Sequence, residues 1–236
     1  MMFENRYSRN VCTLSREECF AVKDLSICVI GCGGLGGYII EMLGRLGIGH
    51  ITAVDGDVFD ETNLNRQLLA TESLIGRGKA EIAGERMAEV NSEVELKVVS
   101  EFLTEENARR IIAGHDVVMD ALDNISSRLI LEEACSQEKI PLVHGAIAGW
   151  YGQVAVVMPG DYFLKKLYSG SGRGGEQSAE NRGSEVEMGN PSFTPAIVAG
   201  IQVSESIKLL LNKGETLVGR MLTIDLERHD FEVFSQ

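Results

Sequence analysis

The stretch that decides the fold covers residues 27–55 and reads ICVIGCGGLGGYIIEMLGRLGIGHITAVD. It opens with an apolar, β-branched run that is typical of a buried strand. A glycine-rich turn follows, then a segment with helical periodicity, and then a second apolar run, residues 51–54, which ends on Asp55. A strand, a glycine turn, a helix and a second strand in this order predict a βαβ unit that binds a nucleotide.

Three glycines of the turn each have a physical role in such a unit. Gly31 allows the tight turn out of the strand, Gly33 lets the backbone approach a phosphate, and Gly36 lets the helix pack close to the sheet. The start of the helix offers N–H groups and a positive dipole to an anion. Asp55 lies roughly 20 residues after the glycine turn, the sequence spacing at which an acid hydrogen-bonds the ribose hydroxyls in such units. The alternative is a glycine-rich turn that merely packs.

Strand and helix patterns alternate through the first 149 residues, which predicts an α/β fold with a doubly wound, mostly parallel, Rossmann-like sheet. In such sheets the site lies beyond the carboxyl ends of the strands. We therefore expect the glycine turn, Asp55 and Asp123 to meet there. The expected helices are 38–46, 78–90, 104–112 and 126–138, and the expected strands are 27–30, 51–54, 94–99, 117–119 and 141–144.

The pattern changes after residue 149. Residues 151–158 alternate as an antiparallel or edge strand would, and residues 222–225 and 231–234 have the pattern of an antiparallel pair. Between them, residues 195–211 form a long apolar helical segment. Residues 160–190 are rich in Gly, Ser, Glu and Asn and are expected to be a loop, for which a mobile lid is favoured over a passive linker.

We expect a single domain over residues 1–236, because a chain of this length suits one α/β unit with an extension. Residues 1–25 would form an N-terminal arm and helix, and residues 26–149 the nucleotide-binding core. Residues 150–236 would supply the crossover loop, the long helix and a C-terminal antiparallel extension.

Composition excludes several kinds of protein. A formal net charge of −13 disfavours nonspecific nucleic-acid binding through the whole surface. The five cysteines form no CxxC pair and suit a reducing compartment, so we expect the cytoplasm. The N-terminus is polar, unlike a signal peptide, and no apolar run approaches the roughly 20 residues of a membrane span.

The residues after Asp55 decide between kinds of nucleotide enzyme. Asn63, Arg66, Gln67 and Lys79 supply two amides and two cations that a dehydrogenase would not need. Cations stabilise charge on a phosphorus centre, and an acid can hold Mg²⁺. Taken singly, Arg66 is more often a surface residue and Lys79 the solvated start of a helix. Their occurrence together behind this glycine turn favours phosphate chemistry.

Six motifs and a helix resemble the ThiF/MoeB/HesA family, the bacterial branch of the ubiquitin-activating-enzyme fold. The resemblance runs along nearly the whole chain, and the combination is far more specific than any single motif. The motifs are Arg6-Tyr7-x-Arg9, Gly31-x-Gly33-Gly34-Leu35-Gly36, Asp55-x-Asp57, Asn63-Leu64-x-Arg66-Gln67, Gly76-x-x-Lys79, Asp123-Asn124 and the helix Gln202-Val203-x-Glu205-x-Ile207-Lys208.

The resemblance implies an adenylyltransferase that uses ATP and Mg²⁺. Its substrate would be the C-terminal glycine carboxylate of a small ubiquitin-like sulfur-carrier protein of the ThiS/MoaD kind, and pyrophosphate would be released. It also implies a homodimer, and it leaves room for a separate sulfur-transfer protein as a partner. A membrane partner is not expected.

The same resemblance implies which residues form the site. Arg66, Lys79, Asp123 and Arg9 would be catalytic, with Asp123 as the Mg²⁺ ligand and Arg9 reaching into the site of the other subunit. The residues that would contact the nucleotide are Gly31, Gly33, Gly34, Leu35, Gly36, Asp55, Asp57, Asn63, Arg66, Gln67, Lys79, Asp123 and Asn124.

The chain departs from many relatives in two ways. It has no CxxC pairs, so we predict a member without zinc. No cysteine lies beyond Cys135, so the crossover loop cannot supply a thiol nucleophile, and we predict adenylylation only.

Three other readings stay open. A relative could activate another carboxylate, such as one on a modified tRNA adenosine, as a dehydratase does. The chain could also be a non-catalytic nucleotide-binding scaffold, or a dehydrogenase.

Overall fold

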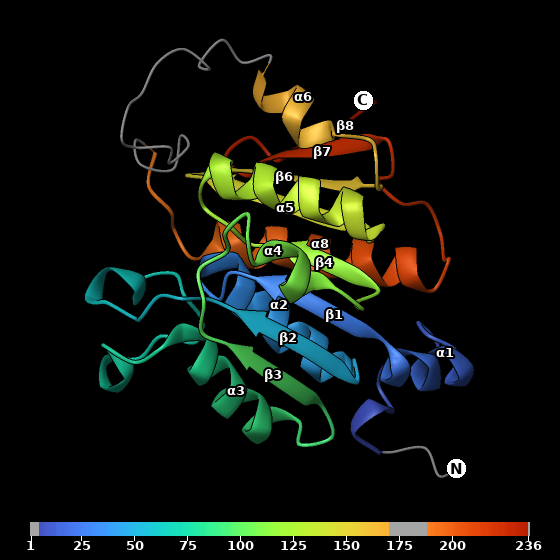
Figure 1. Ribbon diagram of the computed structural model, residues 1–236. Helices are drawn as coiled ribbons and strands as arrows, with labels where there is room; N and C mark the ends of the chain where they lie inside the picture. Colours follow the sequence, from blue (N-terminus) through green and yellow to red (C-terminus); the bar gives the residue numbers. More distant parts are fainter. Residues whose placement is uncertain (1–4, 170–187, 236) are drawn as a thin grey trace.

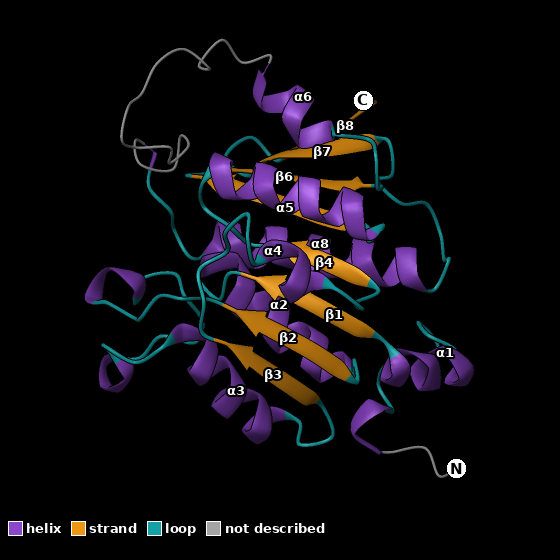
Figure 2. Cartoon of the chain, in the orientation of Figure 1, coloured by secondary structure: helices purple, strands orange, loops and turns teal. Residues whose placement is uncertain are grey.

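One mixed sheet of eight strands organises the residues that the computed structural model describes, 5–169 and 188–235 (Figures 1 and 2). The strand order is β3-β2-β1-β4-β5-β6-β7-β8. The strands are β1 (Ser26–Ile30), β2 (His50–Val54), β3 (Glu95–Val99), β4 (Val117–Asp120), β5 (Leu142–Ala148), β6 (Tyr151–Val157), β7 (Arg220–Asp225) and β8 (Asp230–Ser235).

The first five strands are parallel, and the last three add to the sheet in antiparallel fashion. Ile30, the last residue of β1, is in register with Val54 on one side and Asp120 on the other. The turns that follow these three residues therefore begin at the same edge. The predicted doubly wound sheet with an antiparallel C-terminal extension is confirmed.

Helices cover both faces of the sheet (Figure 2). One apolar core joins α2, α3 and α8 to the strands, and a second core joins α4, α5 and α6 to the opposite face. The alternation of β1 explains this arrangement, because Ile27 and Val29 belong to the first core while Cys28 and Ile30 belong to the second. The helices are α1 (Arg16–Ala21), α2 (Gly34–Leu46), α3 (Lys79–Val90), α4 (Ala108–Ile112), α5 (Ile125–Glu138), α6 (Phe163–Ser169) and α8 (Phe193–Leu210), with 3₁₀ turns η1 (Asn5–Tyr7), η2 (Val22–Asp24), η3 (Glu61–Asn63) and η4 (Glu72–Leu74). Within the described ranges, no helix has both the length and the apolar character that crossing a bilayer requires.

The expected loop over residues 160–190 is wrong in part, because it contains helix α6. Phe163 and Leu164 are buried in the second core, and the Glu132 carboxylate of α5 accepts hydrogen bonds from the backbone N–H groups of Leu164 and Lys165. Burial and a tertiary cap thus stabilise a helix in a polar-looking stretch. The proposed lid falls mainly on residues 170–187, which lie outside the described residues.

The glycine turn leaves no space for side chains at two positions. Gly31 has a φ of +98°, and a Cβ there would lie 2.6 Å from the carbonyl oxygen of Ala121, beyond the end of β4. A Cβ at Gly36 would lie 1.8 Å from the carbonyl oxygen of Gly31. The turn, the start of α2 and the end of β4 are therefore packed backbone to backbone.

The variant Gly36→Ala should lower the melting temperature by about 6–12 °C, because the methyl group forces the start of α2 away from the Gly31 carbonyl at a cost of about 3 kcal/mol. Differential scanning calorimetry measures this shift. Gly34→Ala is the matched control, since the nearest atom to its added Cβ is the Pro195 Cβ at 3.8 Å. Equal melting temperatures for the two variants would contradict the packing argument.

Candidate active site

A cavity of about 370 Å³ opens at the carboxyl ends of β1, β2 and β4. The glycine turn forms one wall, the residues after β2 and the start of α3 form another, and the turn between β4 and α5 closes the third side. The sequence-predicted residues that line it are Gly31, Gly33, Gly34, Asp55, Asp57, Arg66, Gln67, Lys79, Asp123 and Asn124. Segments far apart in the sequence meet here because the parallel strands end in register.

Asp55 joins β2 to the glycine turn. Its Oδ2 accepts a hydrogen bond from the backbone N–H of Cys32 at 2.7 Å, and its Oδ1 accepts one from the N–H of Asp57 at 2.9 Å. Burial raises the pKa of Asp55, and these two hydrogen bonds act in the opposite direction. Carboxylate oxygens keep lone pairs beyond these bonds, so Asp55 can still accept hydrogen bonds from ligand hydroxyl groups.

Lys79 brings a buried cation to the cavity. Its side chain is 8% exposed, and its Nζ lies 2.6 Å from Oδ2 of Asp57, whose side chain is 50% exposed. The backbone N–H of Lys79 also donates to the carbonyl of Asp57 at 3.0 Å. These two contacts hold the two ends of segment 57–79 together. Asp55, Asp57 and Lys79 all line the cavity.

Arg66 and Gln67 extend from the loop after η3. The Arg66 guanidinium donates to the carbonyl of Thr62 at 2.8 Å and to Oδ1 of Asn65 at 2.9 Å. Gln67 is buried, and its Oε1 has no hydrogen-bond partner within the described part of the chain. A Cβ at Gly33 would lie 3.4 Å from the Gln67 amide nitrogen. A buried acceptor beside a glycine turn suits a ligand that donates a hydrogen bond.

Asp123 and Asn124 lie between β4 and α5. Asn124 is the N-cap of α5, where its Oδ1 accepts from the backbone N–H of Ser127 at 2.8 Å. Its Nδ2 donates to Oδ1 of Asp123 at 3.3 Å. The cap therefore fixes the backbone next to Asp123, an exposed residue that lines the same cavity as Arg66 and Lys79.

The donor set fits a nucleoside triphosphate with a divalent cation. Two cations, a carboxylate that can face hydroxyl groups and an unpaired amide oxygen surround one cavity. Among the described residues, no group of three or more His, Cys, Asp and Glu side chains could hold a metal ion alone. Mg²⁺ is commonly held by one or two carboxylates together with substrate phosphates, which suits Asp123. The absence of zinc stays a prediction.

Three predicted nucleotide contacts have another place in the structure. Leu35 is 4% exposed and packs in the first core. Gly36 packs on the Gly31 carbonyl. Asn63 is buried, and its amide completes a capping box with Asp60. Leu35 and Gly36 pack beneath the glycine turn. Asn63 stabilises η3, the element that precedes Arg66.

Arg9 lies at the other end of the sheet. The N-terminal segment sits near the amino-terminal ends of the strands, away from the arrowheads of β1 to β3 (Figure 1). Its neighbour Asn10 donates to the carbonyl of Leu46, and Tyr7 packs against Gly47, both at the far end of α2. Arg9 is exposed at this end of the sheet and is not among the residues that line the cavity, which lies at the carboxyl ends of the strands.

Sequence reasoning missed the segment after β3. Glu101, Phe102 and Leu103 line the cavity, and Phe102 is 66% exposed although a Cβ at Gly56 would lie 2.7 Å from its ring. Their place directly after a predicted parallel strand is a signal that could have found them. Leu122 and Ser127 beside Asp123 were missed as well.

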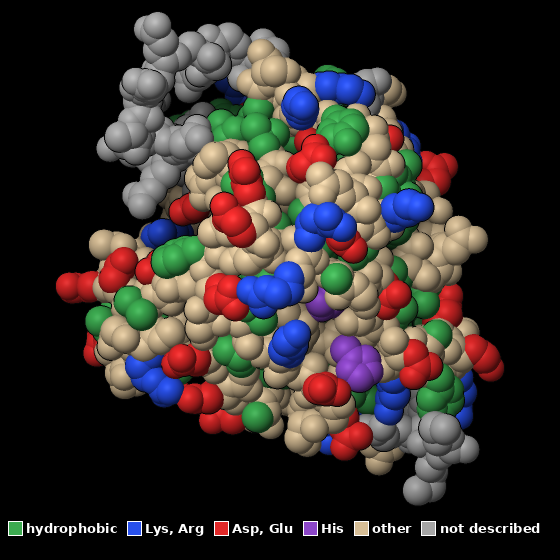
Figure 3. Space-filling model, viewed as in Figure 1, with side chains coloured by type: hydrophobic (Ala, Val, Ile, Leu, Met, Phe, Trp, Pro, Cys, Tyr) green, Lys and Arg blue, Asp and Glu red, His purple; other side chains and the backbone are tan. Residues whose placement is uncertain are grey.

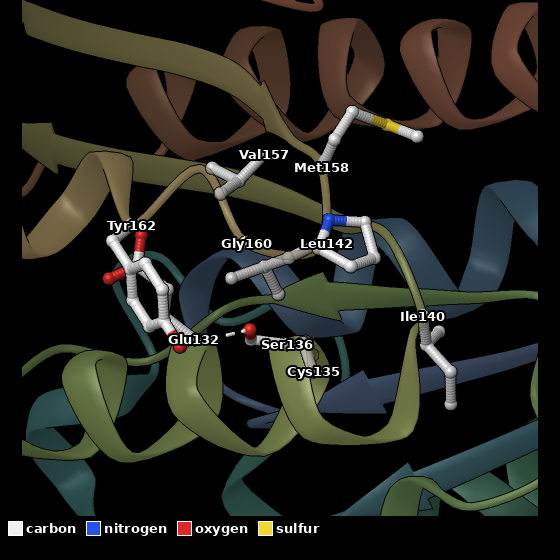
Figure 4. Close-up of a pocket in the computed structure, with 10 residues that line it drawn as sticks. Glu132, Cys135, Ser136, Ile140, Leu142, Val157, Met158, Gly160 and Tyr162 are labelled. Carbon is white, nitrogen blue, oxygen red and sulfur yellow. Dashed lines mark hydrogen bonds between the residues drawn. The ribbon is translucent and has the colours of Figure 1, made fainter.

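A second cavity, of about 10 Å³, lies between α5 and the segment that follows β6 (Figure 4). Ser136 Oγ donates to the hydroxyl of Tyr162 at 3.3 Å across it. Burial raises the pKa of Glu132, which lines it and caps α6. The space holds one water molecule at most, so this cavity is a packing feature rather than a ligand site.

Charged side chains are interspersed on the face drawn in Figure 3. Lys and Arg side chains lie among Asp and Glu side chains over most of this face. A long basic stripe, as a nucleic-acid-binding protein would use, is not seen on the described part of this face.

The ThiF family model matches residues 7–236. The chain belongs to the ThiF family. It is 34% identical over 233 residues to the SAMP-activating enzyme E1 of Haloferax volcanii, covering 97% of this chain and 83% of that protein. It is 31% identical over 210 residues to the molybdopterin-synthase adenylyltransferase of Salmonella typhimurium, covering 87% and 80% respectively.

Solved structures support the fold of this ThiF-family chain. The crystal structure of E. coli MccB with ATP has a TM-score of 0.82 at 19% identity, covering 98% of this chain and 72% of that one. E. coli tRNA N6-threonylcarbamoyladenosine dehydratase has a TM-score of 0.73 at 27% identity, covering 88% and 94%. The predicted family is confirmed, and the chain is an adenylyltransferase.

The variant Gln67→Met should weaken ATP binding about 5–10-fold while leaving the melting temperature of the free protein unchanged or higher, because it removes a buried acceptor that only a ligand can satisfy. Isothermal titration calorimetry and thermal melting measure the two effects. Gln137→Met, which removes a surface amide bonded to Glu133, is the matched control. Unaltered ATP affinity in Gln67→Met would show that the Gln67 side chain does not contribute to ATP binding.

Proposed function

We propose that this ThiF-family chain transfers AMP from ATP to the C-terminal glycine carboxylate of a small ubiquitin-like sulfur-carrier protein. One observation carries the proposal: Arg66, Lys79 and Asp123 line the same cavity as the glycine turn. The two curated relatives described above, a SAMP-activating enzyme and a molybdopterin-synthase adenylyltransferase, support the kind of substrate.

In this proposal each wall of the cavity has one task. The turn at Gly31–Gly34 and the start of α2 receive phosphate, since free N–H groups and the helix dipole favour an anion. Asp55 accepts hydrogen bonds from ribose hydroxyls, and Gln67 receives a donor from the nucleotide. These contacts position the nucleotide relative to the two cations.

The reaction needs positioning and charge stabilisation more than covalent help. A carboxylate oxygen of the carrier attacks the α-phosphorus, the bond from that phosphorus to the bridging oxygen breaks, and pyrophosphate leaves with the electron pair. Arg66 and Lys79 stabilise the charge that develops on the phosphate oxygens. No general base is required, because the attacking carboxylate is already ionised near pH 7. Mg²⁺, held by Asp123 with Asn124 as its neighbour, would neutralise further phosphate charge when bound.

Asp57 has a separate role from the acids that face the ligand. Its carboxylate pairs with Lys79 and is half exposed, so it holds the ammonium group in place without burying a second full charge. A phosphate that enters the cavity can share this ammonium group, because the lysine head carries three donors.

The site is completed by a second copy of the chain in this proposal. Arg9 lies too far from its own cavity, and an exposed arginine on a polar arm is suited to reach a neighbouring subunit. A symmetric homodimer would then place each Arg9 at the partner's cavity.

Sulfur is delivered by another protein in this scheme. Cys28, Cys32 and Cys135 are buried, and burial raises the pKa of each thiol, which disfavours the nucleophilic thiolate. All five cysteines are free thiols, which suits the cytoplasm.

A second candidate activates a carboxylate on a modified tRNA adenosine by the same adenylylating chemistry. The likeness to E. coli tRNA N6-threonylcarbamoyladenosine dehydratase, which the chain covers to 94%, favours it. The net charge of −13 argues against an RNA substrate.

Pyrophosphate exchange into ATP should depend on a small protein that ends in Gly-Gly, and Arg66→Ala, Lys79→Ala and Asp123→Ala should each lower the rate at least about 100-fold. A panel of such carriers, with tRNA as a separate arm, identifies the substrate class. Arg77→Ala, which removes a nearby surface cation paired with Glu85, is the control and should retain activity. Exchange that requires RNA alone would overturn the carrier proposal.

A heterodimer of an Arg9→Ala subunit and an Asp123→Ala subunit should have about half of the wild-type activity per dimer, because one of its two sites keeps both residues. Co-expression with two tags and purification on both isolates it. Each homodimer of a single variant should be inactive. An inactive heterodimer would show that Arg9 does not act across the interface.

A further inference from the structure

A buried polar network lies directly behind Asp123. Asp120, the last residue of β4, is fully buried, and its Oδ2 lies 2.7 Å from Nδ1 of His144 and 3.7 Å from Nε of Arg128. Its Oδ1 accepts the backbone N–H of Leu122 at 3.0 Å. Burying a carboxylate and a guanidinium together is costly unless the geometry is good, so such a pair is weak evidence for a purely stabilising role.

Arg128, in the first turn of α5, contacts the backbone of the same residue, Leu122, on its carbonyl side. It is 4% exposed. Its Nη2 donates to the carbonyl of Leu122 at 2.6 Å, and its Nη1 donates to the hydroxyl of Tyr168 on α6 at 3.1 Å. Leu122 is thus fixed through its N–H by Asp120 and through its carbonyl by Arg128.

The residue that follows Leu122 is Asp123. Its side chain is exposed, and its contact with the Nδ2 of Asn124 is long at 3.3 Å. The direction of its carboxylate therefore depends strongly on the backbone that precedes it. Two charge-assisted hydrogen bonds, one to the N–H and one to the carbonyl of Leu122, strongly restrain that backbone.

We propose that Arg128 is a positioning residue for the adenylyl-transfer site. Together with Asp120 it fixes the backbone on both sides of Leu122 and so directs the Asp123 carboxylate into the cavity, where a divalent cation bound with the nucleotide would contact it. Tyr168 ties the same guanidinium to α6. This proposal rests on the proposed function, because it assumes that Asp123 is the metal ligand.

The shape of the arginine side chain supports this role. The planar guanidinium makes contacts with Leu122, Tyr168 and Asp120 from separate nitrogens. A lysine keeps the charge beside Asp120 but presents a single nitrogen, so it cannot reproduce the three contacts. Partners that orient a metal ligand typically change metal affinity 10–100-fold when they are lost.

The test measures metal binding and backbone motion in Arg128→Lys and Tyr168→Phe. Mn²⁺ binding, followed by electron paramagnetic resonance with a non-hydrolysable ATP analogue present, should weaken about 10-fold in Arg128→Lys and about 2–3-fold in Tyr168→Phe. Affinity for the analogue without metal should stay within about twofold of wild type. Amide hydrogen exchange should accelerate at residues 121–124 in both variants.

Arg109→Lys is the matched control, since it alters a surface pair with Glu138 on the same face and should change neither quantity. Unaltered Mn²⁺ affinity and unaltered exchange in Arg128→Lys would overturn the proposal. If that variant does not fold, Tyr168→Phe decides in the same way. Amide exchange and Mn²⁺ binding do not require a carrier, so a failure to find carrier-dependent activity would overturn the proposed function without deciding this inference.

Discussion

The close packing of the glycine turn on the end of β4 is the constraint on which the rest of the structure depends. Gly31 adopts a positive φ beneath the Ala121 carbonyl, and Gly36 lies against the Gly31 carbonyl. Because no side chain separates these backbones, the start of α2 packs directly against the ends of β1 and β4. The cavity is the space left on the solvent side of this contact.

The charged residues that line the cavity differ in their exposure and in the contacts that stabilise them. The buried Lys79 is balanced by a half-exposed Asp57, while the partly buried Asp55 accepts hydrogen bonds from two backbone N–H groups. Asp123 is left at the rim, supported from behind by Asp120 and Arg128. Each of these charged groups thus has a supporting contact, and Lys79 and Asp57 form an ion pair in the lining of the cavity.

The N-terminal arm of a chain does not contribute Arg9 to the cavity of the same chain. Arg9 lies beyond the amino-terminal ends of the strands, and the cavity lies beyond their carboxyl ends. The length of the sheet separates the two. In a parallel sheet, ligands bind at the carboxyl ends of the strands. In the proposed dimer, the amino ends would instead supply Arg9 to the neighbouring subunit.

Local pattern determined much of this protein. The apolar run before Gly31, the glycine spacing and the acid at Asp55 predicted the parallel core, and the ThiF-family motifs predicted most of the cavity lining. Helix α6 escaped prediction because its stability comes from burial on α5 and from the Glu132 cap, which are contacts made across the fold. The contacts of Arg128 with Leu122 and Tyr168 were decided only by the tertiary structure. Strand register brings together residues that share no local pattern, and a sequence read along its length carries no direct record of that register.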